Sequence, residues 1–201
     1  MQRYSHDPEP VLRCCLLSGG ASQRMGCDKA MLTHPEGDTW LERSLRLLAQ
    51  LQTPITLLSR WPQHLVLADS LGLPQLETVA EPAPWEGPLL ALHRLMERHP
   101  GERLLTAPVD MPDLNIGALN TLLSAARAAP KSIQLAQGGD QLQPLLAVLP
   151  ADPALRRDLA QAVALGERRL QSWLMKQPWQ AVPLEPQALH NCNRPEELER
   201  P

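Results

Sequence analysis

A loop that combines glycines with basic residues follows the first apolar run of the sequence and is well suited to bind phosphate. The run covers residues 11–17, and Gly19, Gly20, Arg24 and Lys29 come after it. Glycines let backbone N–H groups approach phosphate oxygens, and the two basic side chains can neutralise a triphosphate. The spacing fits neither a P-loop nor a dinucleotide fingerprint. An ordinary glycine-rich turn is the alternative that these residues leave open.

Asp110 is a second candidate for chemistry, because it lies on a turn between two prolines. Pro108 has no N–H group and Pro112 favours an extended residue before it, so the segment cannot continue as a regular helix. Mg²⁺ prefers oxygen ligands and is commonly held by one or two carboxylates together with substrate phosphates. Asp110 is therefore a candidate magnesium ligand, and an exposed turn aspartate is the plainer interpretation of the same pattern.

The cysteines, histidines and serines indicate neither a zinc or redox site nor a site for nucleophilic catalysis. The four cysteines have no C-x-x-C spacing, the six histidines form no H-x-x-x-H pair, and no Ser-His-Asp or Cys-His arrangement is suggested. Cys14 and Cys15 are adjacent, so on a strand their side chains would point to opposite faces. We expect structural thiols rather than a zinc or redox site, and no covalent intermediate.

Charge and hydropathy favour a small-molecule partner in the cytoplasm. The formal net charge is −3, from 22 acidic and 19 basic residues, without the basic excess that nucleic-acid binding usually needs. No apolar run approaches the ~20 residues of a membrane span, and the first residues lack the apolar stretch of a signal peptide. We expect neither nucleic acid nor a membrane as partner.

Alternating apolar runs and helical stripes must position these candidates. The patterns predict strands at 11–17, 55–58, 77–80, 103–106, 132–136, 144–149 and 180–183. They predict helices at 40–51, 88–99, 116–129, 153–165 and 167–176, and a final helical turn after Pro195. Caps are expected at Asp38-Thr39 and at Asn115, and a hairpin turn at Gly138-Gly139-Asp140.

This order of elements predicts an α/β fold with a mainly parallel twisted sheet, helices on both faces and one antiparallel strand. Residues 1–10 are interpreted as a flexible N-terminal tail, and 11–201 as a single domain. Ligands of such sheets bind beyond the carboxyl ends of the strands, where Gly19, Glu81 and Asp110 fall. Three separate segments are therefore expected to meet at one edge.

The residues 17–29, read as L-S-G-G-A-S-Q-R-M-G-C-D-K, closely resemble the signature loop of the molybdenum cofactor guanylyltransferases. The loop is shared with related nucleotidyltransferases that act on pterins, sugars and polyols. The resemblance spans roughly residues 13–198. Its further matching segments are Glu81-Pro82, Gly87-Pro88-Leu89, Pro108-Val109-Asp110-Met111-Pro112, Gln143-Pro144-Leu145-Leu146-Ala147, Gly166-Glu167-Arg168-Arg169-Leu170 and Asn191-Cys192-Asn193-Arg194-Pro195-Glu196-Glu197-Leu198.

The resemblance implies a Rossmann-like three-layer sandwich of nucleotidyltransferase type, with GTP over the loop and Mg²⁺ as cofactor. Asp110 is implied as the metal ligand, with Arg24 and Lys29 offsetting phosphate charge. Asn193 would complete the metal or phosphate shell, and a simple turn is its alternative role. The nucleotide contacts implied are Leu17, Ser18, Gly19 and Gly20 (mainly through their backbone), Lys29, Glu81, Asp110 and Asn193.

Three positions depart from the family pattern. Glu81 stands where relatives usually carry Asp, Ser59 is the nearest polar residue to an Asn that is missing from the second strand, and Arg194 replaces a Thr or Ser. Trp85 is a candidate to cover a flat pterin or base, with plain loop packing as the alternative. Arg168 and Arg169 are candidates to hold the phosphate of the second substrate, or are solvated surface.

The activity implied is transfer of GMP from GTP to the terminal phosphate of Mo-molybdopterin, which gives molybdopterin guanine dinucleotide and pyrophosphate. The alternatives are a cytidylyltransferase on the same pterin, a sugar-nucleotide pyrophosphorylase, and a non-catalytic module that delivers cofactor to an oxidoreductase. The expected partners are GTP and Mo-molybdopterin, with molybdoenzyme maturation proteins left open. A monomer or weak oligomer is expected.

Overall fold

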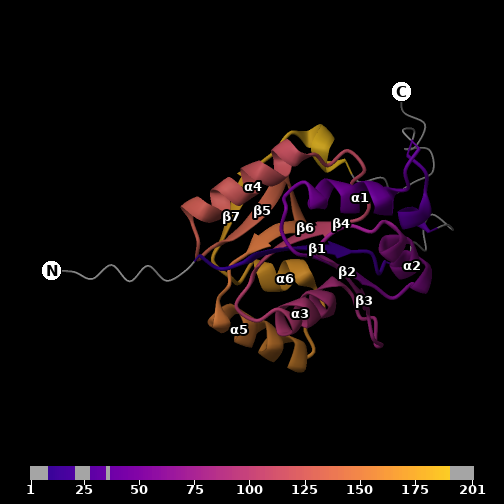
Figure 1. Ribbon diagram of the computed structural model, residues 1–201. Coiled ribbons are helices and arrows are strands. Elements are labelled where there is room, and N and C mark those ends of the chain that lie inside the picture. Colours follow the sequence, from indigo (N-terminus) through magenta and orange to yellow (C-terminus); the bar gives the residue numbers. More distant parts are fainter. Residues whose placement is uncertain (1–8, 21–27, 35–36, 191–201) are drawn as a thin grey trace.

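A seven-stranded sheet in the order β3-β2-β1-β4-β6-β5-β7 runs through the computed structural model, which describes residues 9–20, 28–34 and 37–190 (Figure 1). Only β6 runs antiparallel to its neighbours, and every other adjacent pair is parallel. The mainly parallel sheet with one antiparallel strand is confirmed. The strands are β1 Leu12–Leu17, β2 Ile55–Ser59, β3 Leu76–Ala80, β4 Arg103–Pro108, β5 Ile133–Gly138, β6 Gln141–Leu149 and β7 Trp179–Pro183.

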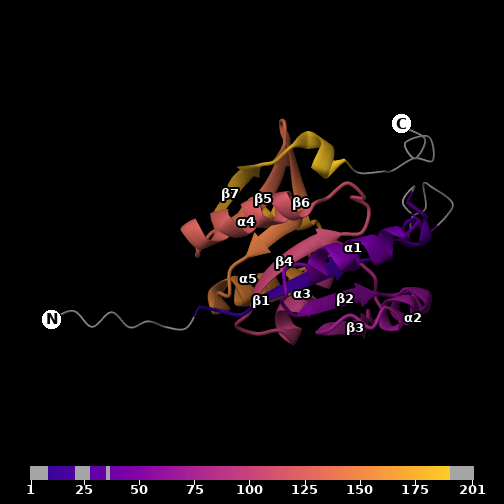
Figure 2. The same cartoon turned by 45° about the horizontal axis from the view of Figure 1, so that its top comes forward.

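Helices cover both faces of the sheet and make three layers (Figures 1 and 2). One face carries α1 (Trp40–Ala49), α2 (Pro62–Ser70) and α4 (Ile116–Ala128). The other carries α3 (Pro88–Arg98), α5 (Pro153–Ala164) and α6 (Leu170–Leu174). Two short 3₁₀ helices, η1 (Lys29–Met31) and η2 (Pro186–Leu189), complete the described elements. The predicted three-layer α/β sandwich is therefore present.

Adjacent cysteines on β1 face the two separate core layers. Cys14 packs in the layer under α1, and Cys15 packs in the layer under α3. Burial raises the pKa of the Cys14 thiol to about 11 and raises the pKa of Cys15 as well. Both thiols are consequently protonated at neutral pH and structural, as expected. Cys27 and Cys192 lie outside the described residues.

Local capping explains where several elements begin. The Thr39 hydroxyl accepts the Glu42 N–H while the Glu42 carboxylate accepts the Thr39 N–H, which closes a capping box at the start of α1. Asn115 caps α4 through the Ala118 N–H. Gly139 has φ +57 in the tight turn between β5 and β6, a conformation that glycine adopts without strain. These predicted starts and the predicted hairpin are confirmed.

The patterns missed α2 and misplaced the start of α6. The buried residues of α2 are His64 and Ala68, so it has no apolar stripe of the kind that identifies a surface helix. The helix predicted at 167–176 spans only Leu170–Leu174, because the Glu167 carboxylate accepts the N–H groups of Arg168 and Arg169 and holds them in a turn. The helical turn predicted after Pro195 lies outside the described residues.

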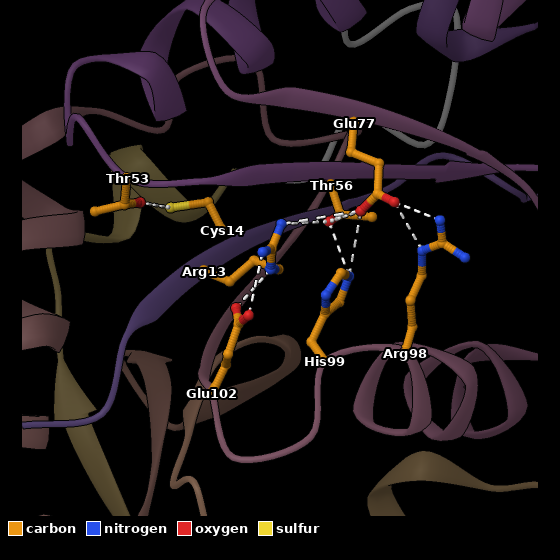
Figure 3. A network of polar contacts seen from close by, with 8 residues as sticks. All are labelled: Arg13, Cys14, Thr53, Thr56, Glu77, Arg98, His99 and Glu102. Carbon is orange, nitrogen blue, oxygen red and sulfur yellow. Dashed lines mark hydrogen bonds and ion pairs between the residues drawn. The ribbon is translucent and has the colours of Figure 1, made fainter.

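A network of polar side chains ties the amino ends of β1, β2 and β3 together (Figure 3). Arg13 on β1 donates to both oxygens of Glu102, at 2.6 and 3.2 Å, and its guanidinium also reaches Thr56 on β2 at 3.3 Å. The Thr56 hydroxyl lies 3.1 Å from His99 Nε2, and Arg98 donates to Glu77 at the start of β3. The network joins three parallel strands at the end of the sheet where they begin. Ligands are expected at the opposite end, where these strands finish.

His99 makes the stability of this edge sensitive to acid. Burial, and secondarily the nearby Arg13 charge, lower the pKa of His99 below its ordinary value of 6.5. Below that ordinary value the unfolded chain binds the proton more readily than the folded chain, so the free energy of unfolding falls as the pH falls. We expect the His99→Gln variant to lose less stability than the parent chain between about pH 7 and pH 5, measured by urea unfolding. Parallel pH profiles for the two proteins would contradict this.

Among the described residues, no helix is long and apolar enough to cross a membrane.

Candidate active site

A pocket of about 340 Å³ opens at the carboxyl ends of β1, β2, β3 and β4. Gly19 and Gly20, which follow β1, border the pocket together with Glu81 after β3 and Asp110 after β4. Lys29 of η1 also borders it. The prediction that Gly19, Glu81 and Asp110 meet at one edge is confirmed. Leu17 and Ser18 border the pocket as well.

Lys29 and Asp110 form an ion pair inside this pocket. Lys29 Nζ lies 3.3 Å from Asp110 Oδ2, and the two side chains are 12% and 29% exposed. Asp28 caps η1 by accepting the Ala30 N–H at 3.2 Å, which fixes the turn from which Lys29 projects. A carboxylate beside an ammonium group at a pocket wall is a suitable place for phosphate and for a divalent metal.

The donor set of the pocket matches a magnesium ion that shares its shell with a substrate. Asp110 supplies a carboxylate oxygen, the donor type that Mg²⁺ prefers. In the part of the chain that the structure describes, no group of three or more His, Cys, Asp or Glu side chains is placed to hold a metal. An ion held by Asp110 would therefore take its other ligands from phosphate oxygens and water, as Mg²⁺ commonly does.

Glu81 is buried beside Gly19 and held by an arginine that sequence reasoning missed. Arg94 of α3 donates to Glu81 Oε1 at 2.8 Å and to the Pro84 carbonyl at 2.9 Å. Burial raises the pKa of Glu81, and the Arg94 and Arg60 charges oppose that rise. One carboxylate oxygen is thus anchored, and the other points toward Gly19.

That second oxygen leaves no room for a side chain at Gly19. A Cβ there would stand 2.6 Å from Glu81 Oε2, whereas a Cβ at Gly20 would meet no atom within 4 Å. We expect Gly19→Ala to destabilise the protein by roughly 1–3 kcal/mol, as overpacking does, and Gly20→Ala to change stability little. Urea unfolding measures both, and the Glu81→Asp change in the Gly19→Ala chain should recover part of the loss. Equal losses for the two glycines would exclude the predicted clash.

His64 connects a serine and an aspartate across the pocket floor. Its Nδ1 lies 2.9 Å from Ser18 Oγ and 2.9 Å from Ser59 Oγ, and its Nε2 lies 2.7 Å from Asp28 Oδ2. The sequence suggested no Ser-His-Asp arrangement, and the structure nevertheless brings these three side chains together. The sequence concealed it because His64 lies on α2, which has no recognisable stripe, and because its partners are far away along the chain.

Arg60 lies between two tryptophans on the rim of the pocket. Its guanidinium carbon is 4.7 Å from the Trp61 ring centre and 5.3 Å from that of Trp85, within the range of cation–π attraction. Trp61 Nε1 also donates to the Gly20 carbonyl at 3.3 Å. Arg60 Nε is buried with no hydrogen-bond partner within the described residues. Trp85, which the sequence suggested as a cover for a flat pterin or base, stacks on this arginine in the structure.

The other candidates fall in different places. Arg168 pairs with Glu86 and donates to the Val163 and Glu167 carbonyls. These contacts fix the segment between α5 and α6 in which Arg168 lies. Ser59, proposed as the nearest polar substitute on β2, donates to the Ser18 carbonyl at 3.0 Å. Arg24, Asn193 and Arg194 lie outside the described residues, so their roles stay predictions.

Comparison with known proteins places this chain among nucleotidyltransferases. The family model of the MobA-like NTP transferase domain matches residues 14–182. A "Probable molybdenum cofactor guanylyltransferase" of Rhodopirellula baltica is 32% identical, over 98% of this chain and 94% of that protein. The "Molybdenum cofactor guanylyltransferase" of Ectopseudomonas mendocina is also 32% identical, over 91% of this chain and 88% of its own length.

Solved structures share the fold at lower identity. Molybdopterin-guanine dinucleotide biosynthesis protein A from Archaeoglobus fulgidus superposes with a TM-score of 0.74 at 19% identity, covering 93% of this chain and 95% of that one. The 4-diphosphocytidyl-2C-methyl-D-erythritolsynthase of Anaerococcus prevotii gives 0.71 at 11% identity, covering 94% and 95%. At these identities the two structures support the nucleotidyltransferase fold.

Proposed function

Since this chain belongs to the MobA-like NTP transferase domain family, we propose that it is a molybdenum cofactor guanylyltransferase. It transfers GMP from GTP to the terminal phosphate of Mo-molybdopterin, which yields the guanine dinucleotide and pyrophosphate. The observation that carries this proposal is the Lys29–Asp110 pair beside Gly19 and Gly20, because it combines a cation, a hard carboxylate and a glycine turn in one pocket. The reaction needs each of these for the phosphates of GTP.

In the proposed reaction, an oxygen of the pterin phosphate attacks the α-phosphorus of GTP, and the bond from that phosphorus to the bridging oxygen breaks. Magnesium, when bound at Asp110, supplies positive charge that stabilises the phosphoryl oxygens. Lys29 leaves Asp110 for a phosphate oxygen, and the glycine turn sets the triphosphate in line with the nucleophile. The attacking phosphate is already anionic, so no general base is required and catalysis consists of positioning and charge stabilisation.

The polar groups that border the pocket suit a purine with both donors and acceptors. Glu81 Oε2 is a carboxylate oxygen able to accept a hydrogen bond, while Arg60 and Trp85 offer a donor and a flat apolar surface. Guanine carries an N2 amino donor and O6 and N7 acceptors, a combination that adenine lacks. We therefore place the base toward Glu81 and the phosphates toward Asp110. Mg²⁺ as cofactor, a cytoplasmic location, delivery by maturation proteins and a monomeric or weakly associated state are parts of the same proposal.

Pyrophosphate release with each of the four NTPs, with and without Mo-molybdopterin, tests the proposal. We expect release with GTP and magnesium only when the pterin is present. Release with CTP in place of GTP would identify a cytidylyltransferase, and release that requires a sugar phosphate would identify a pyrophosphorylase. A chain that binds the pterin but releases pyrophosphate from none of the four NTPs would be a non-catalytic binding module.

A further inference from the structure

One imidazole holds both ends of the phosphate-binding loop. The loop leaves β1 at Ser18 and rejoins the described structure at Asp28, and His64 of α2 contacts each of them. The His64 side chain is 2% exposed, so it meets these partners in a nearly dry environment where hydrogen bonds are strong. Its geometry therefore affects where the loop begins and where it ends.

The contact with Asp28 sets the role of one ring nitrogen of His64. An ionised Asp28 carboxylate only accepts, so His64 Nε2 carries the hydrogen and donates to Oδ2 at 2.7 Å. Nδ1 lies 2.9 Å from the Ser18 hydroxyl, 2.9 Å from the Ser59 hydroxyl and 3.1 Å from the Ser18 carbonyl oxygen. The Ser59 hydroxyl donates to the Ser18 carbonyl at 3.0 Å. Both ring nitrogens of His64 therefore have polar partners.

This arrangement suits positioning better than covalent catalysis. Ser18 is 2% exposed, and its hydroxyl shares His64 Nδ1 with the Ser59 hydroxyl, so it is not presented to a substrate. Asp28, in contrast, is one residue from Lys29 and caps the turn that carries it. A displacement of the Asp28 carboxylate would turn η1 and move the Lys29 ammonium group away from the phosphates.

We propose that His64 is a positioning residue for nucleotidyl transfer, which orients Asp28 and through it aims Lys29 at the phosphates of the nucleotide. The inference rests on the proposed function, because it assigns His64 a part in binding the triphosphate. The ring nitrogens of His64 face Ser18, Ser59 and Asp28, so the proposal gives this residue no direct contact with the substrate. Its loss should weaken recognition of the phosphates and leave recognition of the nucleoside unchanged.

The test compares the affinities of His64 variants for GTP with magnesium and for guanosine, by calorimetry and by competition. We expect His64→Leu to weaken GTP binding about tenfold, the effect of losing one hydrogen bond to a charged group, and to leave guanosine binding within about twofold. His64→Gln keeps an amide donor for Asp28 and should recover most of the GTP affinity. Val66→Ala, on the exposed side of the same helix, is the matched control and should bind both ligands normally.

Asp28→Asn tests the same path from its other end. Asparagine caps a helix as well as aspartate does, but it lacks the negative charge to which His64 Nε2 donates. We expect it to weaken GTP binding as much as His64→Leu, and the double variant to be no weaker than either single one. If His64→Leu fails to fold, His64→Gln and Asp28→Asn carry the comparison.

The outcomes separate this inference from the proposed function. A parent chain that binds no GTP overturns the proposed function itself. If the parent chain binds GTP, and Asp28→Asn and the His64 variants bind it with the same affinity as Val66→Ala, only the positioning role is overturned. Equal losses for GTP and guanosine, or losses that multiply in the double variant, also overturn it, because they show general damage or independent action.

Discussion

Asp110→Asn should remove most of the magnesium-dependent pyrophosphate release from GTP and leave the fold intact. Asparagine has nearly the same shape as aspartate but no charge, so it loses most of its attraction for Mg²⁺ and leaves Lys29 without its ion pair. A metal that polarises phosphoryl oxygens contributes several kcal/mol to the transition state. We expect a loss on the order of a hundredfold or more in kcat/KM, since each 1.36 kcal/mol is a factor of ten.

Asp113→Asn is the control for this variant. Asp113 is exposed, its Oδ2 lies 3.9 Å from His190 Nδ1, and it is not among the described residues that border the pocket. Its replacement should leave turnover and magnesium dependence unchanged, and circular dichroism should show both variants folded. Normal turnover of Asp110→Asn over a magnesium titration would contradict the metal assignment.

Lys29→Ala should weaken GTP binding by about 10- to 100-fold with little change in melting temperature. A hydrogen bond between charged groups is worth about 1.5–3 kcal/mol, which is about one to two powers of ten in affinity. The partly exposed pair with Asp110 contributes little to stability, because such pairs are screened by solvent. Calorimetric titration with GTP and thermal unfolding give the two quantities separately.

Lys131→Ala serves as the matched control, because this lysine is exposed at the turn before β5 and far from the pocket in sequence. It should bind GTP like the parent chain. Equal GTP affinities for Lys29→Ala and Lys131→Ala would refute the phosphate role of Lys29. A large drop in melting temperature for Lys29→Ala would instead assign the residue to the fold.

The sequence predicted those parts of the site that follow from the fold's own periodicity. Gly19, Glu81 and Asp110 each come directly after an apolar run, and the carboxyl ends of parallel strands meet at one edge of a sheet. Placing three strand ends correctly was therefore enough to bring the three residues together. Their roles toward GTP came from the family resemblance, which the matches to relatives support.

The remaining site residues depend on contacts that no local pattern encodes. His64 and Arg94 reach their partners from different helices, and α2 carries a buried histidine where a stripe would show leucine. Arg60 gains its position from Trp61 and Trp85, which flank it only after folding. The requirement for glycine at position 19 likewise arises from Glu81, brought beside it by the sheet. Such pairings need tertiary structure.

The fate of the α-phosphate of GTP tests the proposed reaction most directly. The chain would be incubated with magnesium, Mo-molybdopterin and GTP labelled at the α-phosphate, and the products separated and weighed by mass spectrometry. We predict that the label appears in a molybdopterin guanine dinucleotide, in equal amount to unlabelled pyrophosphate. Label that remains in GTP, or that leaves as free GMP, while the pterin is recovered unchanged would contradict guanylyl transfer by this protein.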